Sequence, residues 1–286
     1  MEEKNKVQGS TLYLVGTPIG NLSDLTERAR KVLSEVDFIA AEDTRNSMRL
    51  LSAIGIRSEL ISYHEHNKRS SGEKIVARLL SGESCALITD AGMPAISDPG
   101  EDLARLAKEA GLTVTTVPGP TALISALSLS GLPTGRFCFE GFLSAKGSER
   151  KKQLTALERE ERTMIFYEAP HKLRATLSDM LSTFGADRKI SLCRELTKLN
   201  EEICQITLGE AIKLYEEREP RGEYVLVVAG AEIRSTQTDS LLSLSPEEHV
   251  RLYTDDGMSK MDAIKKAARE RGIPKSELYK MLVDIG

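Results

Sequence analysis

Apolar and polar residues alternate with two different spacings along the chain up to Val117. Short apolar runs fit β-strands, and the stretches between them, such as Leu25–Val36, carry apolar residues at helical spacing. The predicted strands are Thr11–Gly16, Phe38–Ala41, Leu60–Ser62, Cys85–Thr89 and Val114–Val117. Strands that alternate with helices indicate a parallel sheet covered by helices.

The pattern changes after Pro118, which precedes a predicted helix that ends near Leu129. Further strands follow with fewer helices between them. They are predicted at Phe137–Phe142, Met164–Glu168, Ile190–Arg194, Ile203–Leu208 and Tyr224–Ala229. We therefore expect a flexible N-terminus over residues 1–10, a parallel α/β domain over 11–118 and a mixed α+β domain over 119–231.

The last part of the chain has a different character. Residues 232–245 are rich in Ser and Thr without a regular period, which is typical of a linker. Residues 246–286 form a small helical module that starts with Ser245 as a cap. Two more helices are predicted, from about Lys260 to Arg271 and after Pro274, and the short Gly-containing turn between them gives a helix-turn-helix-like pattern.

Composition restricts the function classes. The chain has 286 residues, of which 40% are apolar and 29% charged, as in globular proteins with buried cores. Its 39 basic and 43 acidic residues give a net charge of −4, which excludes a uniformly basic nucleic-acid coat but permits a local basic patch. The four cysteines form no CxxC pair, so neither a zinc ribbon nor a dithiol centre is expected.

Membrane insertion and secretion are not expected. The uncharged stretch Ala110–Gly135 contains a Pro-Gly-Pro break and many Ser and Thr residues, so it does not predict a membrane helix. The charged N-terminus has no apolar signal core. The sequence therefore predicts a cytoplasmic protein.

Three loops of small residues follow predicted strands. The Gly16–Leu22 loop is best interpreted, on its spacing alone, as a plain Gly-Pro turn. The Thr89–Gly100 loop is long and tight, and a loop at the carboxyl end of a parallel strand is where open α/β sheets bind ligands. The Pro118–Ala122 segment starts a helix whose free N–H groups suit a carboxylate or a ribose hydroxyl, although many helices start this way.

Taken together, the order of these motifs resembles the tetrapyrrole methylase superfamily. The segments that carry the resemblance to its rRNA-methylating branch are LVGTPIGNLSDLTERA, AEDTRNS, YHEHN, TDAGMPAISDPG, VPGPTALISAL, FYEAPHKL and RGEYVLVV, and together they cover roughly Thr11–Ala229. The first of them departs from the GPG-type loop of the tetrapyrrole-modifying branch, which favours the RNA branch.

The resemblance implies a fold, a cofactor and a substrate. The fold is α/β, with two tetrapyrrole-methylase-like domains that hold S-adenosylmethionine between them, followed here by the helical module. The implied reaction is 2′-O-methylation of the ribose of a cytidine in the decoding region of 16S rRNA, within the small ribosomal subunit, by a homodimer. DNA is not an expected partner.

The resemblance also implies which residues bind the cofactor. Those from the loops of the first domain and the helix start are Thr17, Pro18, Asp90, Ala91, Gly92, Met93, Pro94, Ser97, Thr121 and Ala122. Those from the second domain, which closes over adenine, are Tyr167, Leu196, Gly222 and Tyr224.

Transfer of a methyl group from a sulfonium requires an oriented 2′-oxygen, exclusion of water and removal of a proton, and it needs no metal. The catalytic candidates are Glu42, Asp43, His64 and Glu168, with His66, His171, Arg194 and Glu195 as further bases or orienting residues. Asp43 is equally well explained as a helix cap. The His-Glu-His segment lacks partner ligands at metal-site spacing.

Local basic patches are the candidate RNA contacts. Arg45 either meets phosphate or pairs with Asp43. A Gly-Ser loop that opens a helix carries Lys146, Arg150, Lys151 and Lys152. In the C-terminal module, Lys265, Lys266 and Arg269 share a helix face opposite Ile264 and Ala268, a face that can follow phosphates without reading bases. An ordinary solvated helix face is the alternative.

Two other functions remain open from the sequence. One is a corrinoid or porphyrinoid C-methyltransferase of the same fold, for which a basic C-terminal module has no obvious use. The other is a nucleic-acid-binding regulator that uses the helix-turn-helix and senses a small ligand through the α/β domains.

Overall fold

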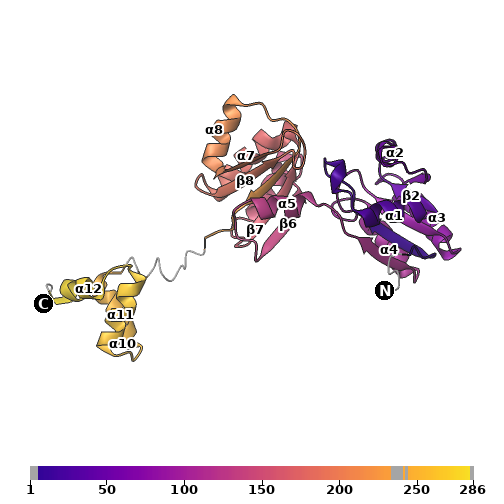
Figure 1. The fold of residues 1–286 in the computed structure, drawn as a ribbon. Helices are drawn as coiled ribbons and strands as arrows, with labels where there is room; N and C mark the ends of the chain where they lie inside the picture. The colour runs from indigo at the N-terminus through magenta and orange to yellow at the C-terminus, as the bar shows by residue number, and fades with distance from the viewer. Residues whose placement is uncertain (1–5, 233–240, 242–243, 284–286) are drawn as a thin grey trace. The chain divides into compact units, whose positions relative to one another are not determined.

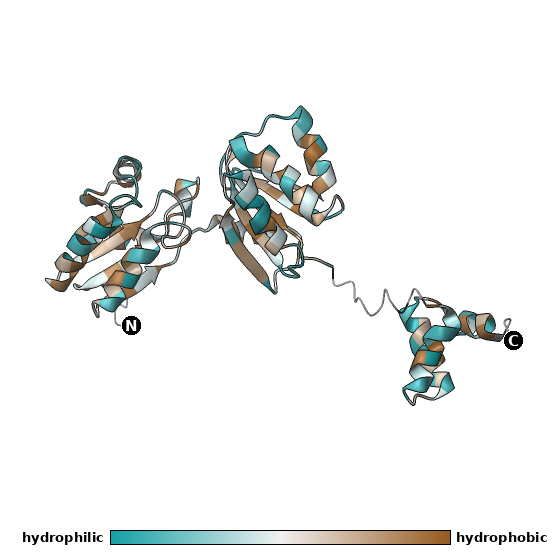
Figure 2. Ribbon diagram, turned by 180° about the vertical axis from the view of Figure 1, so that it is seen from behind, coloured by the Kyte–Doolittle hydropathy of each residue, from teal (hydrophilic) through white to brown (hydrophobic). Residues whose placement is uncertain are grey.

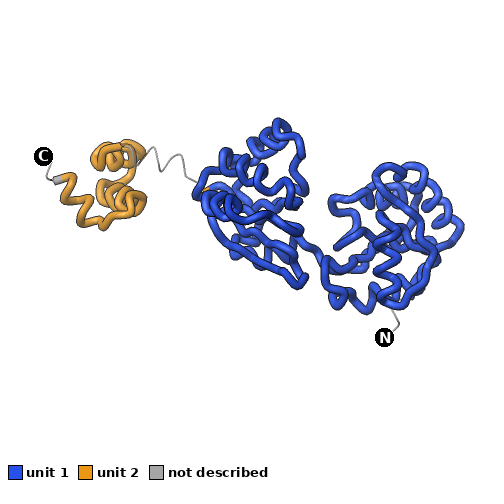
Figure 3. The backbone as a smooth tube through the Cα atoms, turned by 90° about the horizontal axis from the view of Figure 1, so that it is seen from above, with its two compact units in different colours: residues 1–231 blue, residues 232–286 orange. Residues whose placement is uncertain are grey.

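The structure is a computed structural model that describes residues 6–232, 241 and 244–283. The chain divides into two compact units, residues 1–231 and 232–286, which Figure 3 shows in different colours. Most of the predicted linker, at 233–240 and 242–243, and half of the predicted flexible N-terminus, at 1–5, lie outside the described residues.

The first sheet contains five parallel strands in the order β3-β2-β4-β1-β5. Its strands are β1 (Thr11–Val15), β2 (Phe38–Ala41), β3 (Glu59–Ser62), β4 (Ser84–Ile88) and β5 (Thr113–Val117). The connections contain η1 (Leu22–Asp24), α1 (Glu27–Glu35), α2 (Thr44–Ala53), α3 (Lys68–Leu80) and α4 (Gly100–Glu109). The predicted parallel, helix-covered sheet is confirmed, and Figure 1 shows its helices around the strands.

Both faces of this sheet are buried, which explains why its central strands are mostly apolar. Side chains alternate between the faces along each strand. Val15 and Ile39 pack with α1 and α2 on one face, whereas Leu12 and Phe38 pack with α3 and α4 on the other. In Figure 2 the strands are mostly brown, and the helices turn teal surfaces outward.

The second sheet is mixed and has the order β6-β7-β10-β8-β9. Its strands are β6 (Phe137–Phe142), β7 (Thr163–Glu168), β8 (Lys189–Arg194), β9 (Glu202–Thr207) and β10 (Tyr224–Val228). Strands β6 and β7 are parallel, and the other neighbours are antiparallel. The prediction of a mixed second domain is therefore confirmed.

Helices cover the two faces of the second sheet unequally. The helices of this part are α5 (Ala122–Leu129), α6 (Gly147–Ala156), α7 (Pro170–Phe184) and α8 (Leu208–Glu217). Leu154, Leu177 and Tyr215 from the last three of them pack against Phe166 on one face. Short α5 packs on the opposite face, which it shares with a cavity.

The C-terminal unit contains α10 (Pro246–Asp255), α11 (Lys260–Glu270) and α12 (Lys275–Val283). Ser245 forms a capping box with Glu248 at the start of α10, as the sequence predicts. The core includes Ile264 and Ala268, so the predicted inward face of α11 is confirmed. Among the described residues, no helix has the length and apolar character needed to cross a membrane.

Candidate active site

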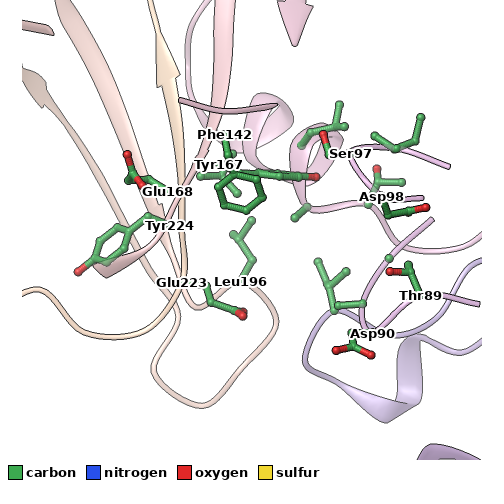
Figure 4. Close-up of a pocket in the computed structure, with 18 of the residues that line it drawn as sticks. Thr89, Asp90, Ser97, Asp98, Phe142, Tyr167, Glu168, Leu196, Glu223 and Tyr224 are labelled. Carbon is green, nitrogen blue, oxygen red and sulfur yellow. The ribbon is translucent and has the colours of Figure 1, made fainter. Parts of the chain in front are cut away.

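A cavity of about 550 Å³ lies at the carboxyl end of the first sheet and faces the second sheet. Its walls come from the loop after β4, from the start of α5 and from the strands and loops of the second sheet (Figure 4). The volume lies within the range of about 300–1,000 Å³ that is typical of sites for cofactors and other small molecules. The position agrees with the expected ligand site of an open α/β sheet.

The loop after β4 is held in an unusual backbone conformation. Ala95 and Ser97 have φ values of 68° and 63°, in the left-handed region that costs about 1–3 kcal/mol for residues other than glycine. Asp98 stabilises this shape, because its Oδ1 accepts hydrogen bonds from the N–H groups of Ala95 (3.0 Å) and Gly100 (2.7 Å). The strain is concentrated beside the cavity, where it fixes the orientation of Ser97.

Thr17 joins the first loop to this strained loop. Its backbone exchanges hydrogen bonds with Gly92 at 2.9 and 3.1 Å, and its hydroxyl donates to the carbonyl oxygen of Thr89 at 3.2 Å. A Cβ on Gly16 would lie 2.7 Å from both Gly119 Cα and Met93 Sδ. The loop from Gly16 is thus more than the plain turn that its spacing predicts, because three loops meet there without room for a side chain.

Carboxylates dominate the charged lining of the cavity. The acidic residues are Glu42, Asp90, Asp98, Glu168 and Glu223. The one cation among the described lining residues is Lys198, which pairs with Glu195 at 2.8 Å and with Glu223 at 2.7 Å. Because carboxylates outnumber this paired lysine in the described lining, the cavity favours a cationic ligand group.

Glu42 differs from the other cavity carboxylates. Its position directly after β2 brings it to the cavity, where Thr89 Oγ1 donates a hydrogen bond to Oε2 at 3.2 Å. Burial raises its pKa, and the nearby Asp90 and Asp98 raise it further, although the Thr89 hydroxyl opposes this shift. A carboxylate with a raised pKa inside a cavity is suited to accept a proton.

The start of α5 adds hydrogen-bond donors to the same cavity. Thr121, the N-cap residue, makes no side-chain cap, and both Thr121 and Ala122 line the cavity. The first N–H groups of a helix have no partner within the helix, and the helix dipole favours an anion beside them. The cavity therefore combines a site for a carboxylate with acidic walls for a cation.

Comparison with known proteins decides the family. The family described as Tetrapyrrole (Corrin/Porphyrin) Methylases matches residues 11–212. The chain belongs to the tetrapyrrole methylase family. The resemblance seen in the sequence is thereby confirmed.

Several curated proteins are similar to this chain over almost their whole length. The "Ribosomal RNA small subunit methyltransferase I" of Synechocystis sp. is 44% identical over 274 residues, which cover 96% of this chain and 98% of the relative. The protein of the same name from Bacillus subtilis is 45% identical over 281 residues, covering 98% and 96%. The Escherichia coli O157:H7 protein of that name is 44% identical over 277 residues, covering 96% and 94%.

Solved structures of other methyltransferases confirm the fold. The uroporphyrin-III-C-methyltransferase of Thermus thermophilus aligns with a TM-score of 0.55 at 20% identity, covering 76% of this chain and 94% of that one. The methyltransferase CobJ aligns with a TM-score of 0.59 at 18% identity, covering 78% and 95%. At these identities the likeness shows the fold alone.

Tetrapyrrole methylases use S-adenosylmethionine as methyl donor, and the cavity fits that molecule. When bound, the cofactor supplies an electrophilic methyl group on a sulfonium. Asp98 Oδ2 is buried without a hydrogen-bond partner among the described residues, so the cavity wall has a free acceptor for an amine or hydroxyl. The acidic walls would suit its sulfonium and ammonium groups, the start of α5 would suit its carboxylate, and Leu196 and Tyr167 would offer apolar surface to its adenine.

Most of the predicted cofactor residues of this tetrapyrrole methylase line the cavity. These are Asp90, Ala91, Gly92, Met93, Ser97, Thr121, Ala122, Tyr167 and Leu196. Pro18, Pro94 and Gly222 are not part of the lining. The lining residues that the sequence reasoning missed include Ile19, Ile96, Asp98, Phe142, Lys198 and Glu223. Only tertiary structure brings Phe142 and Lys198 to the cavity, whereas Glu223 lies inside the quoted RGEYVLVV segment.

Two predicted cofactor residues direct their hydroxyl groups to other parts of the protein. Thr17 is completely buried, so it supports the loop after β4 instead of touching a ligand. Tyr224 is part of the cavity lining, although its phenol points away from the cavity (Figure 4), so its contact with the cofactor stays a prediction. Its oxygen instead accepts a hydrogen bond from the Tyr215 hydroxyl at 3.2 Å, in the core beneath α7 and α8.

Among the four catalytic candidates, Glu42 and Glu168 both line the cavity, but their carboxylates have different surroundings. Glu168 is almost fully buried, and its carboxylate accepts hydrogen bonds from the Ala169 N–H at 2.9 Å and the Thr176 hydroxyl at 2.5 Å. It also pairs with Lys172 at 3.4 Å. The start of α7 thus engages this carboxylate, and its role as a catalytic base stays a prediction.

The helix-cap interpretation of Asp43 is confirmed. Its carboxylate accepts hydrogen bonds from the backbone N–H of Arg45 at 2.8 Å and from the Arg45 guanidinium at 3.0 and 3.2 Å. These bonds lower the pKa of Asp43 to about 2, which makes it a poor base. His64 is not among the cavity-lining residues. Among the described residues, no group of three His, Cys, Asp or Glu side chains is arranged to hold a metal ion.

The predicted RNA contacts differ in their availability. Arg150 is buried and its Nε donates to Asp179 at 2.7 Å, so its prediction as an exposed phosphate ligand is wrong. Arg45 pairs with Asp43 but stays largely exposed. The remaining candidates are also exposed: Lys146, Lys151, Lys152, Lys265, Lys266 and Arg269. Lys266 also lies over the Tyr253 ring at 4.0 Å.

Proposed function

We propose that this tetrapyrrole methylase transfers a methyl group from S-adenosylmethionine to the 2′-oxygen of a cytidine ribose in the decoding region of 16S rRNA. Three observations support the proposal. Relatives whose printed name is "Ribosomal RNA small subunit methyltransferase I" align over nearly the whole chain at 44–45% identity. The cavity fits the methyl donor, and it presents Glu42 as a carboxylate with a raised pKa.

The position of Glu42 is the observation on which the chemistry depends. A ribose hydroxyl becomes nucleophilic when its proton is accepted as the methyl group is attacked. Glu42 accepts that proton, while the Thr89 hydroxyl orients the carboxylate through its hydrogen bond. The strained loop at Ser97 fixes another wall of the cavity. A rigid cavity holds the ribose 2′-oxygen and the methyl group in a defined geometry.

The C-terminal unit supplies the RNA contact in this proposal. The exposed face of α11 carries Lys265, Lys266 and Arg269. Cations on one helix face neutralise phosphates and fix the register of the protein on RNA, but they do not read the sequence. We also propose that the substrate is the small ribosomal subunit and that the enzyme acts as a homodimer.

Mass spectrometry of 16S rRNA nucleosides tests the proposed reaction. We expect a ribose-methylated cytidine in rRNA from cells with the gene, its loss when the gene is deleted, and its return when the wild-type gene is restored. A strain that carries the Glu42→Gln gene is expected to resemble the deletion. Unchanged methylation in the deletion strain, or a methyl group on the base instead of the ribose, would contradict the proposal.

A further inference from the structure

Phe142, the last residue of β6, places an aromatic ring at the cavity. The side chain is 54% exposed, although it follows directly on a sheet with a large apolar core. Burial of a phenylalanine is strongly favourable, so a ligand that covers this ring beside the cavity would gain free energy from the contact. Figure 4 shows the ring next to Tyr167, on the side of the cavity that faces Ser97.

A β-bulge puts Phe142 on this face. In the parallel pairing of β6 with β7, Phe139 lies opposite Ile165, but Phe142 lies opposite Tyr167, because one extra residue stands between Phe139 and Gly141. With strict alternation Phe142 would pair with Glu168, whose side chain lies on the face covered by α7. The extra residue therefore moves the ring from the helix-covered face to the cavity face.

Glycine makes this bulge possible. Gly141 has a φ of 64°, in the left-handed region, and a Cβ there would lie 3.1 Å from Ser97 Oγ. The end of β6 thus approaches the strained loop closely, and it carries Phe142 toward the part of the cavity where Ser97 lies. Bulges of this kind occur next to active sites, where they redirect a side chain.

The ring is supported by its neighbours. Its centroid is 5.4 Å from that of Tyr167 with a 58° tilt, and Tyr167 in turn contacts Phe139 edge-on at 4.9 Å. Lys172 Nζ lies 5.5 Å from the Phe142 centroid and is held by Glu168. Contacts with Tyr167 and Lys172 orient the ring, and its exposed surface remains free for a planar group.

We propose that Phe142 is the stacking partner of the target cytosine. The inference depends on the proposed function: a 2′-oxygen reaches a methyl donor inside a cavity only when its nucleotide leaves the RNA stack. The freed base then needs a flat apolar surface, and aromatic side chains provide such surfaces in proteins that bind single-stranded RNA. Phe142 provides it beside the loop that forms the cofactor wall.

Kinetics of the full-length protein test this role. The substrates are S-adenosylmethionine with a labelled methyl group and small ribosomal subunits from cells that lack the gene. We expect Phe142→Ala to lower kcat/KM for the subunit by about 5- to 150-fold, which corresponds to the ~1–3 kcal/mol of base–aromatic stacking. Phe142→Trp keeps most of the activity, whereas Phe142→Leu, which is apolar but not planar, loses it nearly as Ala does.

A matched control lies on the same strand. Phe137, at the other end of β6, is 37% exposed and is not part of the cavity lining, so Phe137→Ala is expected to leave kcat/KM unchanged. The affinity for S-adenosylmethionine, measured by calorimetry, should not change in Phe142→Ala. Loss of that affinity would show that the ring holds adenine, and a fully active Phe142→Ala or Phe142→Leu variant would show that no stacking occurs. Either result overturns the proposal.

An RNA-binding measurement separates this proposal from the proposed reaction. Two RNA fragments of the decoding region are compared in the presence of S-adenosylhomocysteine, one with the target cytidine and one with an abasic residue there. Wild-type protein should prefer the cytidine by about 5- to 150-fold, and Phe142→Ala should bind both equally. Equal binding by the wild type contradicts the stacking, whereas absence of methyl transfer by the wild type contradicts the reaction alone.

Discussion

Replacement of Glu42 by Gln is the most informative single change in this enzyme. The substitution keeps the shape of the side chain and an oxygen that can accept the Thr89 hydrogen bond, which is 3.2 Å long in the wild type. It removes the ability of the side chain to accept a proton. General-base catalysis typically contributes about 10²- to 10⁴-fold, or ~2.7–5.4 kcal/mol of barrier. We therefore expect kcat to fall by that factor while the affinity for S-adenosylmethionine stays within a few-fold.

The pH dependence gives a second measure of the same carboxylate. The base must be ionised to act, so activity should rise with pH through the pKa of Glu42. Because burial and the neighbouring Asp90 and Asp98 raise that pKa, the rise should occur at a higher pH than for an ordinary glutamate. The rise should be absent in Glu42→Gln, and single-turnover rates of methyl transfer between pH 4 and 8 would measure it.

The contribution of Glu42 to the free energy of unfolding should fall as the pH rises, whereas the activity should rise. A raised folded-state pKa means that Glu42 contributes stability below its ordinary pKa and loses it as the pH rises through the raised value. At pH 7 the ionised carboxylate is therefore a cost, and Glu42→Gln should unfold at a urea concentration no lower than that of the wild type. The advantage should shrink at pH 4.

The adjacent Asp43 is a matched control with the opposite shift. Its pKa is lowered to about 2, so it contributes stability above its ordinary value of 3.8 and loses it as the pH falls toward about 2. Asp43→Asn should keep the cap and the activity but lose some stability at pH 7. Full activity of Glu42→Gln, or equal losses of activity in both variants, would refute the assignment of Glu42 as base.

Three further predictions follow from other parts of the structure. Gly119→Ala would place a Cβ 2.9 Å from Gly16 Cα. We expect the free energy of unfolding, measured with urea, to fall by about 1–3 kcal/mol, and the affinity for S-adenosylmethionine, measured by calorimetry, to become weaker. Unchanged values would mean that the two loops separate easily. Arg150→Met leaves the buried Asp179 without its main partner, so the free energy of unfolding, measured with urea, should fall by about 3–5 kcal/mol. Lys152 is exposed, and Lys152→Met should leave the free energy of unfolding unchanged. Replacement of three cations of α11 by Gln should reduce the slope of log Kd for rRNA against log salt concentration by about 2–3. The affinity for S-adenosylmethionine should not change. An unchanged slope would mean that RNA contacts another part of the protein. These cations are Lys265, Lys266 and Arg269.

The sequence predicts the fold better than the site, for a physical reason. Strands such as Phe38–Ala41 and helix starts such as Ser245 depend on local patterns of apolar and capping residues, and the structure has them where these patterns predict. The orientation of a side chain depends on tertiary pairing. Both Tyr167 and Tyr224 belong to quoted motifs, yet only Tyr167 faces the cavity, because their strands present opposite faces at these positions.

The roles of charged residues depend on tertiary structure in the same way. In the sequence, Arg150 is one of several cations in a loop, and Asp43 is an acid beside another acid. Whether each is a surface charge, a cap or a base depends on partners that lie nearby only after folding, as Asp179 does for Arg150. The spacing of apolar residues does not predict such a partner. It also does not predict the burial that raises the pKa of Glu42, whereas hydrogen bonds lower the pKa of Asp43.

Backbone strain links these unpredicted features to the reaction. Five non-glycine residues of the described chain have positive φ; Ala95 and Ser97 belong to the loop after β4, and Glu195 and Thr197 flank Leu196, which lines the cavity. Four strained residues at one cavity cost several kcal/mol in total, at ~1–3 kcal/mol each, and a sequence without this site would have no reason to retain them. The loops that carry these residues are anchored on two sheets with buried apolar cores, and these cores stabilise the strained conformations at the cavity.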